Sequence, residues 1–445
     1  MKNPLTQKIL ACAALLRVLV LAGCAIAPST ATTAPQASAM KGRALGGQLP
    51  VAFGTVQLYA TGTSGYGSAS TALITPSSAA ANSASYPVQT DANGNFNITG
   101  DYACPTPSST PVYLVITGGN PGNGGGVVNN NLAIMAALGP CSGLGSIGFV
   151  NVSEVSTVAS VWALAPFMSA IDHIGTTSTN ATGMTLAMAA VNELYNINSG
   201  TVGGPTLPTG ATLPVDEING LADILATCVN STGGVATDTS TNCGELFHYA
   251  TPGATAPTDT VTAAMNIAQN PSLNAGPLWS LIGGIGSPVF PTAVPQPAAW
   301  TIAINYTGGT MSTPSGIAND ASGNIWVANS GNNSVTKLTN AGAGQNFTAG
   351  SMNAPSSIAL DSSGNAWITN SGNNTLTKLN STGSTGTIFS GNGLSSPKSI
   401  SFDGLGNIWV ANSGSVSLFT SAGAAIGNYT VSSVTVPVGI AANPQ

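Results

Sequence analysis

Side chains that could do acid–base or metal chemistry are scarce in this chain of 445 residues. It has two histidines, His173 and His248, and only 5% of its residues are charged. Glu245, three residues before His248, could share a helical face with that histidine, whereas Asp172 would point away from its neighbour His173 on a helix. Because the two histidines share no carboxylate, we expect ordinary surface or core residues and no metal ion or cofactor.

Three aspartates are the only carboxylates after Trp300, and they occupy equivalent positions in three copies of one sequence pattern: Asp320, Asp361 and Asp403. A catalytic centre uses residues that occur once, not one copy in every repeat. The equivalent aspartates are therefore better explained as turn residues whose carboxylates accept hydrogen bonds from backbone N–H groups. Calcium is the less favoured alternative here and at residues 91–95, because the spacing lacks the later glutamate of a calcium loop. We therefore predict no catalytic residue and no metal ligand.

The repeated pattern begins at a proline in each copy and starts a fourth time near the end of the sequence: Pro314, Pro355, Pro397 and Pro437. Its length of about 40 residues is that of a four-stranded propeller blade. In the first copy we expect strands at residues 317–318, 325–328, 334–338 and 345–349. The tryptophans of the three copies should pack between neighbouring blades: Trp326, Trp367 and Trp409.

The motif D-x-x-G-N-x-W-V-x-N-S-G-N-N-x-V resembles NHL repeats, whose relatives include streptogramin-lyase-like and gluconolactonase-like propellers. The resemblance covers residues 300–445. The sequence differs from NHL repeats in two features. Ser334 and Thr375 stand where NHL repeats often carry Arg, and the third copy lacks the Asn-Asn pair before Ser415. The family forms rings of about five or six blades, whereas this sequence supplies three and a fraction.

The segment from Trp300 to Tyr306 sits where an outer strand that closes such a ring is expected. The blade that this segment would complete lacks some of its other strands in the given sequence, so we interpret the sequence as truncated. A half-ring that pairs with a second copy of the chain is the less favoured alternative. Three turns of the repeats should lie on one rim and could face a ligand, although simple hairpin turns are favoured. These turns begin at Asn329, Asn370 and Asn412.

The first 24 residues are typical of a bacterial export signal, with Lys2 and Lys8 before an apolar run. The run ends in Leu-Ala-Gly-Cys, which resembles a lipobox and implies that Cys24 carries the lipid. Arg17 interrupts the apolar run, so ordinary secretion stays open as an alternative. Residues 25–44 are rich in Ala, Ser, Thr and Pro and predict a flexible tether.

Four further cysteines suit an oxidising compartment. They allow three pairings, and proximity along the chain favours Cys104 with Cys141 and Cys228 with Cys243. Free thiols are less favoured in an exported chain, and zinc is less favoured still because no second ligand lies at a suitable spacing.

The fold class that we predict is multidomain. Residues 45–149 alternate apolar and polar positions in short runs, which indicates a β-sandwich, and its segments at 49–59 and 90–96 resemble carboxypeptidase regulatory-like domains. Residues 150–295 change to helical periodicity and predict a mainly α-helical domain. Residues 300–445 form the propeller repeats.

These features favour an exported, lipid-anchored cell-envelope protein whose propeller is a binding or display scaffold for a protein, peptide or glycan. The alternative is a streptogramin-lyase-like or lactonase-like enzyme whose catalytic blades lie outside this sequence. The net charge of −6 and the eight Lys and Arg residues leave no basic surface for nucleic acid.

Overall fold

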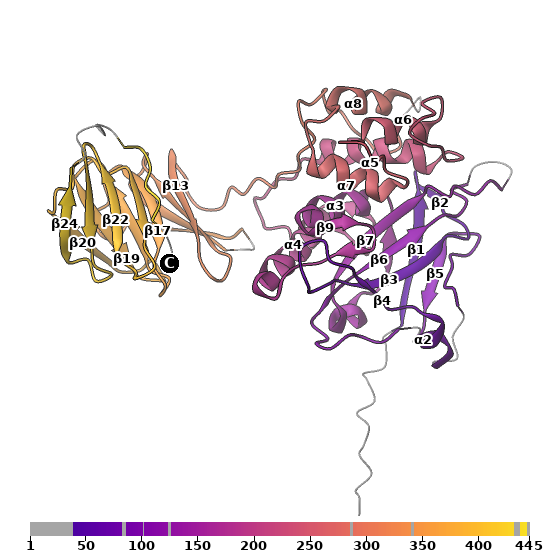
Figure 1. Ribbon diagram of the computed structural model, residues 1–445, viewed down its shortest axis with the longest axis horizontal. Coiled ribbons are helices and arrows are strands. Elements are labelled where there is room, and N and C mark those ends of the chain that lie inside the picture. The colour runs from indigo at the N-terminus through magenta and orange to yellow at the C-terminus, as the bar shows by residue number, and fades with distance from the viewer. Residues whose placement is uncertain are drawn as a thin grey trace, which may run out of the picture.

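The computed structural model describes residues 39–81, 86–100, 102–122, 126–284, 288–339, 342–430 and 437–442. The export signal, Cys24 and residues 25–38 of the expected tether lie outside the described residues. Figure 1 shows a larger part made of two sheets and a layer of helices, and a smaller part that contains the repeats. In the described ranges, none of the helices combines the length and apolar character needed to cross a membrane.

Two four-stranded sheets face each other in the larger part, as the sequence predicts for a β-sandwich. One sheet contains β2 (Leu49–Pro50), β1 (Met40–Gly46), β5 (Asn95–Ile98) and β8 (Val150–Val152). The other has the order β4 (Thr71–Ala72), β3 (Thr55–Ala60), β6 (Pro111–Thr117) and β7 (Ala133–Pro140). Alternate residues of β3, namely Val56, Leu58 and Ala60, enter the core between the sheets.

The first strand overturns the expectation that residues 25–44 form a tether to their end. Strand β1 begins at Met40, pairs with β5 in the antiparallel direction and with β8 in the parallel direction. Met40 and Ala44 are buried between the sheets. Local sequence could not show this, because the partner strand β8 lies more than a hundred residues further along the chain and supplies the pairing.

Six helices follow β8: α3 (Glu154–Leu164), α4 (Ala181–Leu194), α5 (Val215–Val229), α6 (Asn242–Tyr249), α7 (Thr260–Gln269) and α8 (Ala275–Gly284). Helices α3, α4 and α7 contact β7. Helices α5, α6 and α8 pack against one another, and α5 also contacts α3. Figure 1 shows α6 and α8 beyond α5 on the side away from the sheets.

The helices share one hydrophobic core with the second sheet, so the predicted domain boundary at residue 150 is wrong. Tyr113 and Val115 of β6 and Met135 of β7 belong to the same buried cluster as α3, α5 and α7. Strand β7 is buried along nearly its whole length because the first sheet covers one face and the helices cover the other. The result is three layers, sheet on sheet on helices.

Both disulfides have the pairing that proximity favours. Cys104 is bonded to Cys141, and Cys228 at the end of α5 is bonded to Cys243 in α6. The two bonds are consistent with export to an oxidising compartment.

The repeats form three antiparallel sheets of four strands, each in sequential order, as blades should. The first contains β13 (Pro314–Asn319), β14 (Ile325–Asn329), β15 (Ser334–Leu338) and β16 (Gly344–Phe347). The second contains β17 (Pro355–Leu360), β18 (Ala366–Asn370), β19 (Thr375–Leu379) and β20 (Gly386–Ser390). The third contains β21 (Ser399–Phe402), β22 (Ile408–Asn412), β23 (Ser415–Phe419) and β24 (Ala425–Tyr429).

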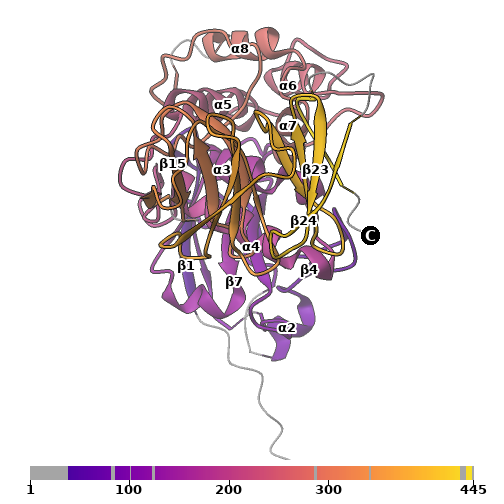
Figure 2. The ribbon, with the colours of Figure 1, turned by 90° about the vertical axis from the view of Figure 1, so that its left-hand side faces the viewer.

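The first strands of the blades, β13, β17 and β21, lie side by side. Figure 2 shows the three sheets in front of the larger part.

The segment from Trp300 to Tyr306 is not the closing strand that the sequence predicts. Trp300 is fully buried in the helical core, where its backbone N–H donates to Pro271 O, and Asn305 bridges to Thr212. Tyr306 Oη donates to Glu193 Oε2 of α4 at 2.6 Å. The segment therefore belongs to the larger part, because a bulky aromatic residue is stabilised wherever a core can enclose it.

Candidate functional site

Each repeated aspartate organises a turn and holds the tryptophan that follows it. In the first blade, Asp320 Oδ1 accepts the backbone N–H groups of Ser322 and Asn324 at 3.0 and 2.9 Å. Its Oδ2 accepts Trp326 Nε1–H at 3.3 Å and lies 3.3 Å from Lys337 Nζ. Partial burial opposes ionisation, but hydrogen bonds from Asn324, Trp326 and Lys337 outweigh it and lower the pKa of Asp320 to about 2.

The second blade repeats this arrangement, and the third departs from it at one side chain. Trp367 Nε1–H donates to Asp361 Oδ2 at 3.1 Å, with Lys378 Nζ 3.3 Å from the same oxygen. In the third blade Leu418 pairs with Trp409 across the strands, where the other blades have lysine. All three carboxylates are engaged in turns, the role that the sequence favours.

The three asparagines considered as possible ligand contacts point instead into the blades, next to the hairpin turns that the sequence favours. Asn329, Asn370 and Asn412 end the second strand of each blade and are fully buried. Their Nδ2 groups donate to Thr336 Oγ1 and Thr377 Oγ1 at 2.9 Å and to Ser417 Oγ at 2.8 Å. Ligand contact is therefore wrong for these side chains, because each amide donates its hydrogen bond to a hydroxyl on the neighbouring strand. The turn sequence alone does not reveal that hydroxyl.

The last asparagine of each of the first two turns connects its blade to the following blade. Asn333 and Asn374 have positive φ angles of 54° and 56°, which asparagine tolerates better than most residues. Asn333 Oδ1 accepts Ala354 N–H at 2.8 Å, and Asn374 Oδ1 accepts Ser396 N–H at 2.6 Å. The third copy lacks this asparagine. The sequence shows the deletion, but only the contact in the other two blades shows that the residue joins one blade to the following one.

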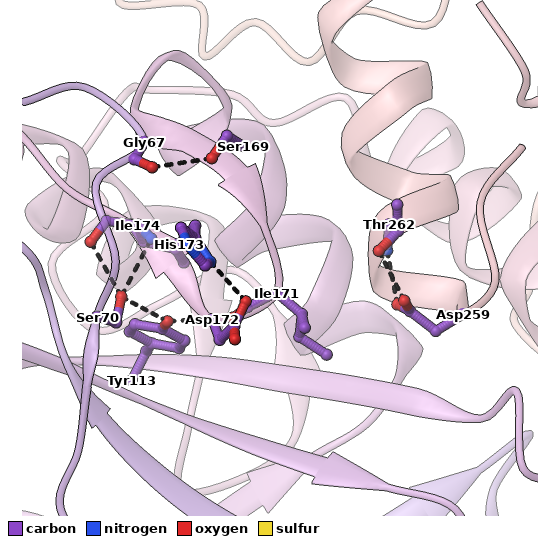
Figure 3. Close-up of polar contacts among 10 residues, drawn as sticks. All are labelled: Gly67, Ser70, Tyr113, Ser169, Ile171, Asp172, His173, Ile174, Asp259 and Thr262. Carbon is purple, nitrogen blue, oxygen red and sulfur yellow. Dashed lines mark hydrogen bonds and ion pairs between the residues drawn. The ribbon is translucent and has the colours of Figure 1, made fainter. Parts of the chain in front are cut away.

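The histidine next to a carboxylate lies in a hairpin formed by β9 (Met168–Ala170) and β10 (His173–Ile174). Figure 3 shows His173 Nδ1 contacting Asp172 Oδ1, at 2.7 Å. The expectation that Asp172 points away assumed a helix and was wrong. Both side chains are about half exposed, at 43% and 50%, which is typical of a surface pair.

The serine beside this hairpin, Ser70, is hydrogen-bonded to a tyrosine and to the backbone. In Figure 3, Tyr113 Oη donates to Ser70 Oγ at 2.8 Å, and Ser70 Oγ contacts the backbone of Ile174. No hydrogen bond between His173 and Ser70 occurs in the described part of the chain. Burial raises the pKa of Tyr113 well above its usual value, so the phenol stays protonated and locks the hairpin to β6.

The second histidine, unlike the first, has no contact with a carboxylate among the described residues. His248 meets Tyr249 edge-on with ring centroids 5.3 Å apart. Within the described ranges, no hydrogen bond or ion pair joins His248 to Glu245. The two histidines therefore do not come together in one site.

The three tryptophans differ in how they are covered. Trp326 stacks on Phe347 and packs with Ile358 of the second blade, and both tryptophans of the first two blades are fully buried. Trp367 likewise lies with Phe389 and Ile400 of the third blade. The expected packing between blades is thus present at both junctions.

The third tryptophan lines a cavity. Trp409 is partly exposed and stacks on Tyr429, whose exposed fraction is 47%. A cavity of about 600 Å³ opens beside them, lined by Asp403, Trp409, Val416, Tyr429, Ile440, Ala441 and Ala442. Ile440 N–H donates to Ser399 Oγ at 3.3 Å, so the start of the fourth repeat lies beside β21 and covers part of this face.

No protein-family model and no curated protein matches the chain. Among solved structures, a catalytically inactive virginiamycin B lyase from Staphylococcus aureus with quinupristin matches with a TM-score of 0.28 and 21% identity, over 32% of this chain and 49% of that one. A streptogramin B lyase matches with the same score and identity, over 48% of its chain. A nidogen/laminin complex matches with a TM-score of 0.28 and 17% identity, over 56% of its chain.

This chain therefore spans about half the length of the solved structures it matches. Likeness at this level assigns neither a reaction nor a ligand.

Proposed function

We propose that this protein is an exported, lipid-anchored cell-envelope protein whose blades form a binding scaffold without a reaction of their own. The two disulfides support export. The engagement of Asp320, Asp361 and Asp403 in turn and tryptophan contacts supports a structural role for the repeats. The observation that carries the proposal is the open face of the third blade, formed by Trp409, Val416 and Tyr429.

The chemistry of the ligand follows from what covers the equivalent faces of the other blades. Each is covered by an extended segment in which an isoleucine follows a proline by three residues, at Ile358 and Ile400, and by the second strand of the next blade. Beside the third blade Ile440 takes the place of this isoleucine and lines the cavity. The rest of this face has an equivalent aromatic pair, with Tyr429 in place of phenylalanine, and apolar neighbours. Asp403 is the one charged residue among the described residues that line it. An extended apolar segment of a protein or peptide therefore fits it better than a polar glycan.

A synthetic peptide that copies residues 364–371 tests this proposal, because it contains strand β18, whose Ala366 and Ile368 pack with Trp326 of the first blade. We expect it to bind the full chain and change the fluorescence of Trp409. Tyr429→Lys should abolish binding, whereas Ile388→Lys should preserve it. Ile388 is a matched control because its exposed fraction is also 47% and it lies on β20.

Three outcomes would contradict the proposal or redirect it. Equal peptide binding by both lysine variants would show that the face formed by Trp409, Val416 and Tyr429 is not the binding site. Binding of peptidoglycan fragments in place of the peptide would assign a glycan ligand. Dimers in sedimentation velocity that Tyr429→Lys dissociates would identify the partner as a second copy of this chain, whose exposed Ile317 lies in the equivalent strand β13.

A further inference from the structure

A cavity of about 440 Å³ lies in the larger part of the molecule, where the end of β1 meets the helices. Cavities that bind small molecules have volumes of roughly 300–1,000 Å³. Segments distant in sequence supply the walls: Arg43, Leu45 and Gln48 in and after β1, Ser153 and Val155 at the start of α3, residues 200–202, Asn219 of α5, and Phe290. The cavity is therefore large enough for a small organic ligand.

Arg43 and Leu45 reach the cavity because side chains alternate along β1. Met40 and Ala44 are buried between the two sheets, so Arg43 and Leu45 lie on the opposite face of the first sheet. Lys41 shares that face, but it is not among the described residues that line the cavity. The strand thus directs one arginine and one leucine into the same space.

A hairpin beside this face supplies a second wall. It consists of β11 (Tyr195–Asn196) and β12 (Thr201–Val202), which pair in the antiparallel direction. Asn151 of β8 is the partner of Arg43 across the sheet, and it donates its backbone N–H to Ile197 O at 2.9 Å. This bond holds the hairpin at the level of Arg43 and places β12 on the wall.

The wall at Phe290 is held by two side-chain amides that also line the cavity. Gln48 Nε2 donates to Val289 O at 2.9 Å, and Asn219 Nδ2 donates to Pro291 O at 2.6 Å. Phe290 lies between these two anchored residues. Hydrogen bonds within the protein therefore fix the walls before a ligand binds, which lowers the cost of ordering the site.

Arg43 gives the cavity a positive charge that the protein does not pair. It is the one charged residue among the described residues that line the cavity. Its Nε donates to Asn93 O at 3.1 Å, but no ion pair of the described ranges includes it, and no hydrogen bond there uses its Nη groups. A guanidinium presents its N–H donors in a planar fork that matches a carboxylate.

Two neighbouring carboxyl groups leave this charge available. Asp91 accepts the backbone N–H groups of Asn95 and Asn93 at 2.8 Å each, and these bonds, followed by the charge of Arg43, lower its pKa. Glu154 begins α3 and is fully buried, which raises its pKa to about 8. Below that pH it holds a proton and adds no negative charge beside the cavity.

The other walls favour an apolar group. Leu45, Val155, Val202 and Phe290 line the cavity together with Arg43. A carboxylate that carries an apolar tail matches both features, because the guanidinium binds the carboxylate in a bidentate way and the tail removes apolar surface from water. Inorganic phosphate would leave the apolar walls in contact with water.

We propose that this cavity binds a small organic carboxylate, with the carboxylate on Arg43 and the apolar part against Leu45, Val202 and Phe290. The site gives the larger part of the molecule a role in capturing an acidic solute. It goes beyond the proposed function and is independent of it, because the open blade face lies in the other part of the molecule (Figure 1).

The test compares probes that share one apolar group and differ in charge: 3-phenylpropionate, 3-phenylpropanamide and 3-phenylpropylamine. Each is titrated into the full chain below the raised pKa of Glu154, by calorimetry or, for weak binding, by ligand-observed NMR. The carboxylate should bind at one site and at least about tenfold more tightly than the amide, because hydrogen bonds to charged groups are stronger. The amine and inorganic phosphate should bind more weakly than the carboxylate.

Arg43→Gln should weaken binding of the carboxylate at least about tenfold and leave binding of the amide unchanged. Arg43→Lys keeps the charge but loses the fork, so its affinity should lie between those of wild type and Arg43→Gln. Lys41→Gln is the matched control, since it removes the same charge from the same face of β1, and it should leave both affinities unchanged. Val202→Trp fills the cavity from the hairpin and should abolish binding of both probes.

A Tm close to that of wild type shows that a variant is folded. Equal affinity of wild type for the carboxylate and the amide would overturn the proposal, as would no binding of the carboxylate at millimolar concentration. Equal losses in Arg43→Gln and Lys41→Gln would also overturn it, because binding would then depend on net charge alone. Peptide binding at the open blade face is measured separately, so failure of one proposal leaves the other standing.

Discussion

Asp403 Oδ2 accepts a hydrogen bond from Trp409 Nε1 at 3.0 Å, although the third blade has Leu418 where the other blades have a lysine beside this pair. The aspartate–tryptophan contact thus persists without the lysine. It is the common element of the three repeats. The lysine is an addition found where the tryptophan is fully buried.

Removal of the aspartate should cost more in the second blade than in the third. Asp361→Ala leaves the buried Nε1–H of Trp367 without an acceptor and removes the bonds that hold the turn, so we expect a loss of about 2–4 kcal/mol in the free energy of unfolding. Asp403→Ala should cost about half as much, because water can reach the partly exposed Trp409. Urea unfolding followed by tryptophan fluorescence measures both, and equal losses would contradict this account.

The lysine should contribute little and in a salt-dependent way. Lys378 Nζ lies 3.3 Å from Asp361 Oδ2 and 4.8 Å from the centroid of the Trp367 ring. Lys378→Leu, which copies the third blade, should therefore cost no more than about 1 kcal/mol. Most of this difference should vanish in 1 M NaCl. A loss that salt does not reduce would show that packing of the lysine stem matters more than its charge.

The stability of the protein should fall as pH rises through the range set by Glu154. Burial, followed by the charge of Asp223, raises the pKa of Glu154 to about 8 from 4.5. Between these values the folded state holds a proton that the unfolded state has released, so the free energy of unfolding drops by up to about 1.4 kcal/mol per pH unit. Below this range the stabilisation is fully present.

The variant Glu154→Gln isolates this group from others that titrate nearby. Asp223 also has a pKa raised by burial, and Glu154 itself adds to the raised pKa of Tyr195. The free energy of unfolding of wild type relative to that of Glu154→Gln should fall as pH rises over this range. A difference that stays flat with pH would mean that Glu154 does not carry the proton.

Both disulfides should stabilise the larger part. The Cys228–Cys243 bond closes a loop with a sequence separation of 15, and the Cys104–Cys141 bond one of 37. Loop entropy predicts losses of about 3 and 3.8 kcal/mol for the respective Cys→Ser pairs. Thermal unfolding of each double variant without reductant measures the loss, and a smaller loss for the longer loop would argue against the entropic explanation.

The lipid anchor that we propose depends on Cys24. The variant Cys24→Ser should move the exported protein from the membrane fraction to the soluble fraction and remove labelling by radioactive palmitate. The double variant Cys228→Ser and Cys243→Ser, which keeps Cys24, is the control and should stay in the membrane fraction. Release of wild type into the soluble fraction would instead support ordinary secretion.

The sequence by itself determined the features that repeat or act over short distances. The blade length, the turns at Asp320 and its equivalents, the sandwich and the disulfide pairing all follow from local spacing, because backbone turns and alternating strands are encoded by neighbours in the chain. The packing of Trp326 and Trp367 between blades follows from the repeat as well.

Only the tertiary structure decided which distant segments meet. It paired Met40–Gly46 with Val150–Val152, enclosed Trp300 among helices, turned Asn329 into its blade, and buried Glu154 and Asp223 without a counter-charge. Sequence periodicity records which face of a segment is apolar, but not which partner covers that face. Since partners far along the chain supply the hydrogen bonds and the burial, the role of these residues depends on the complete fold.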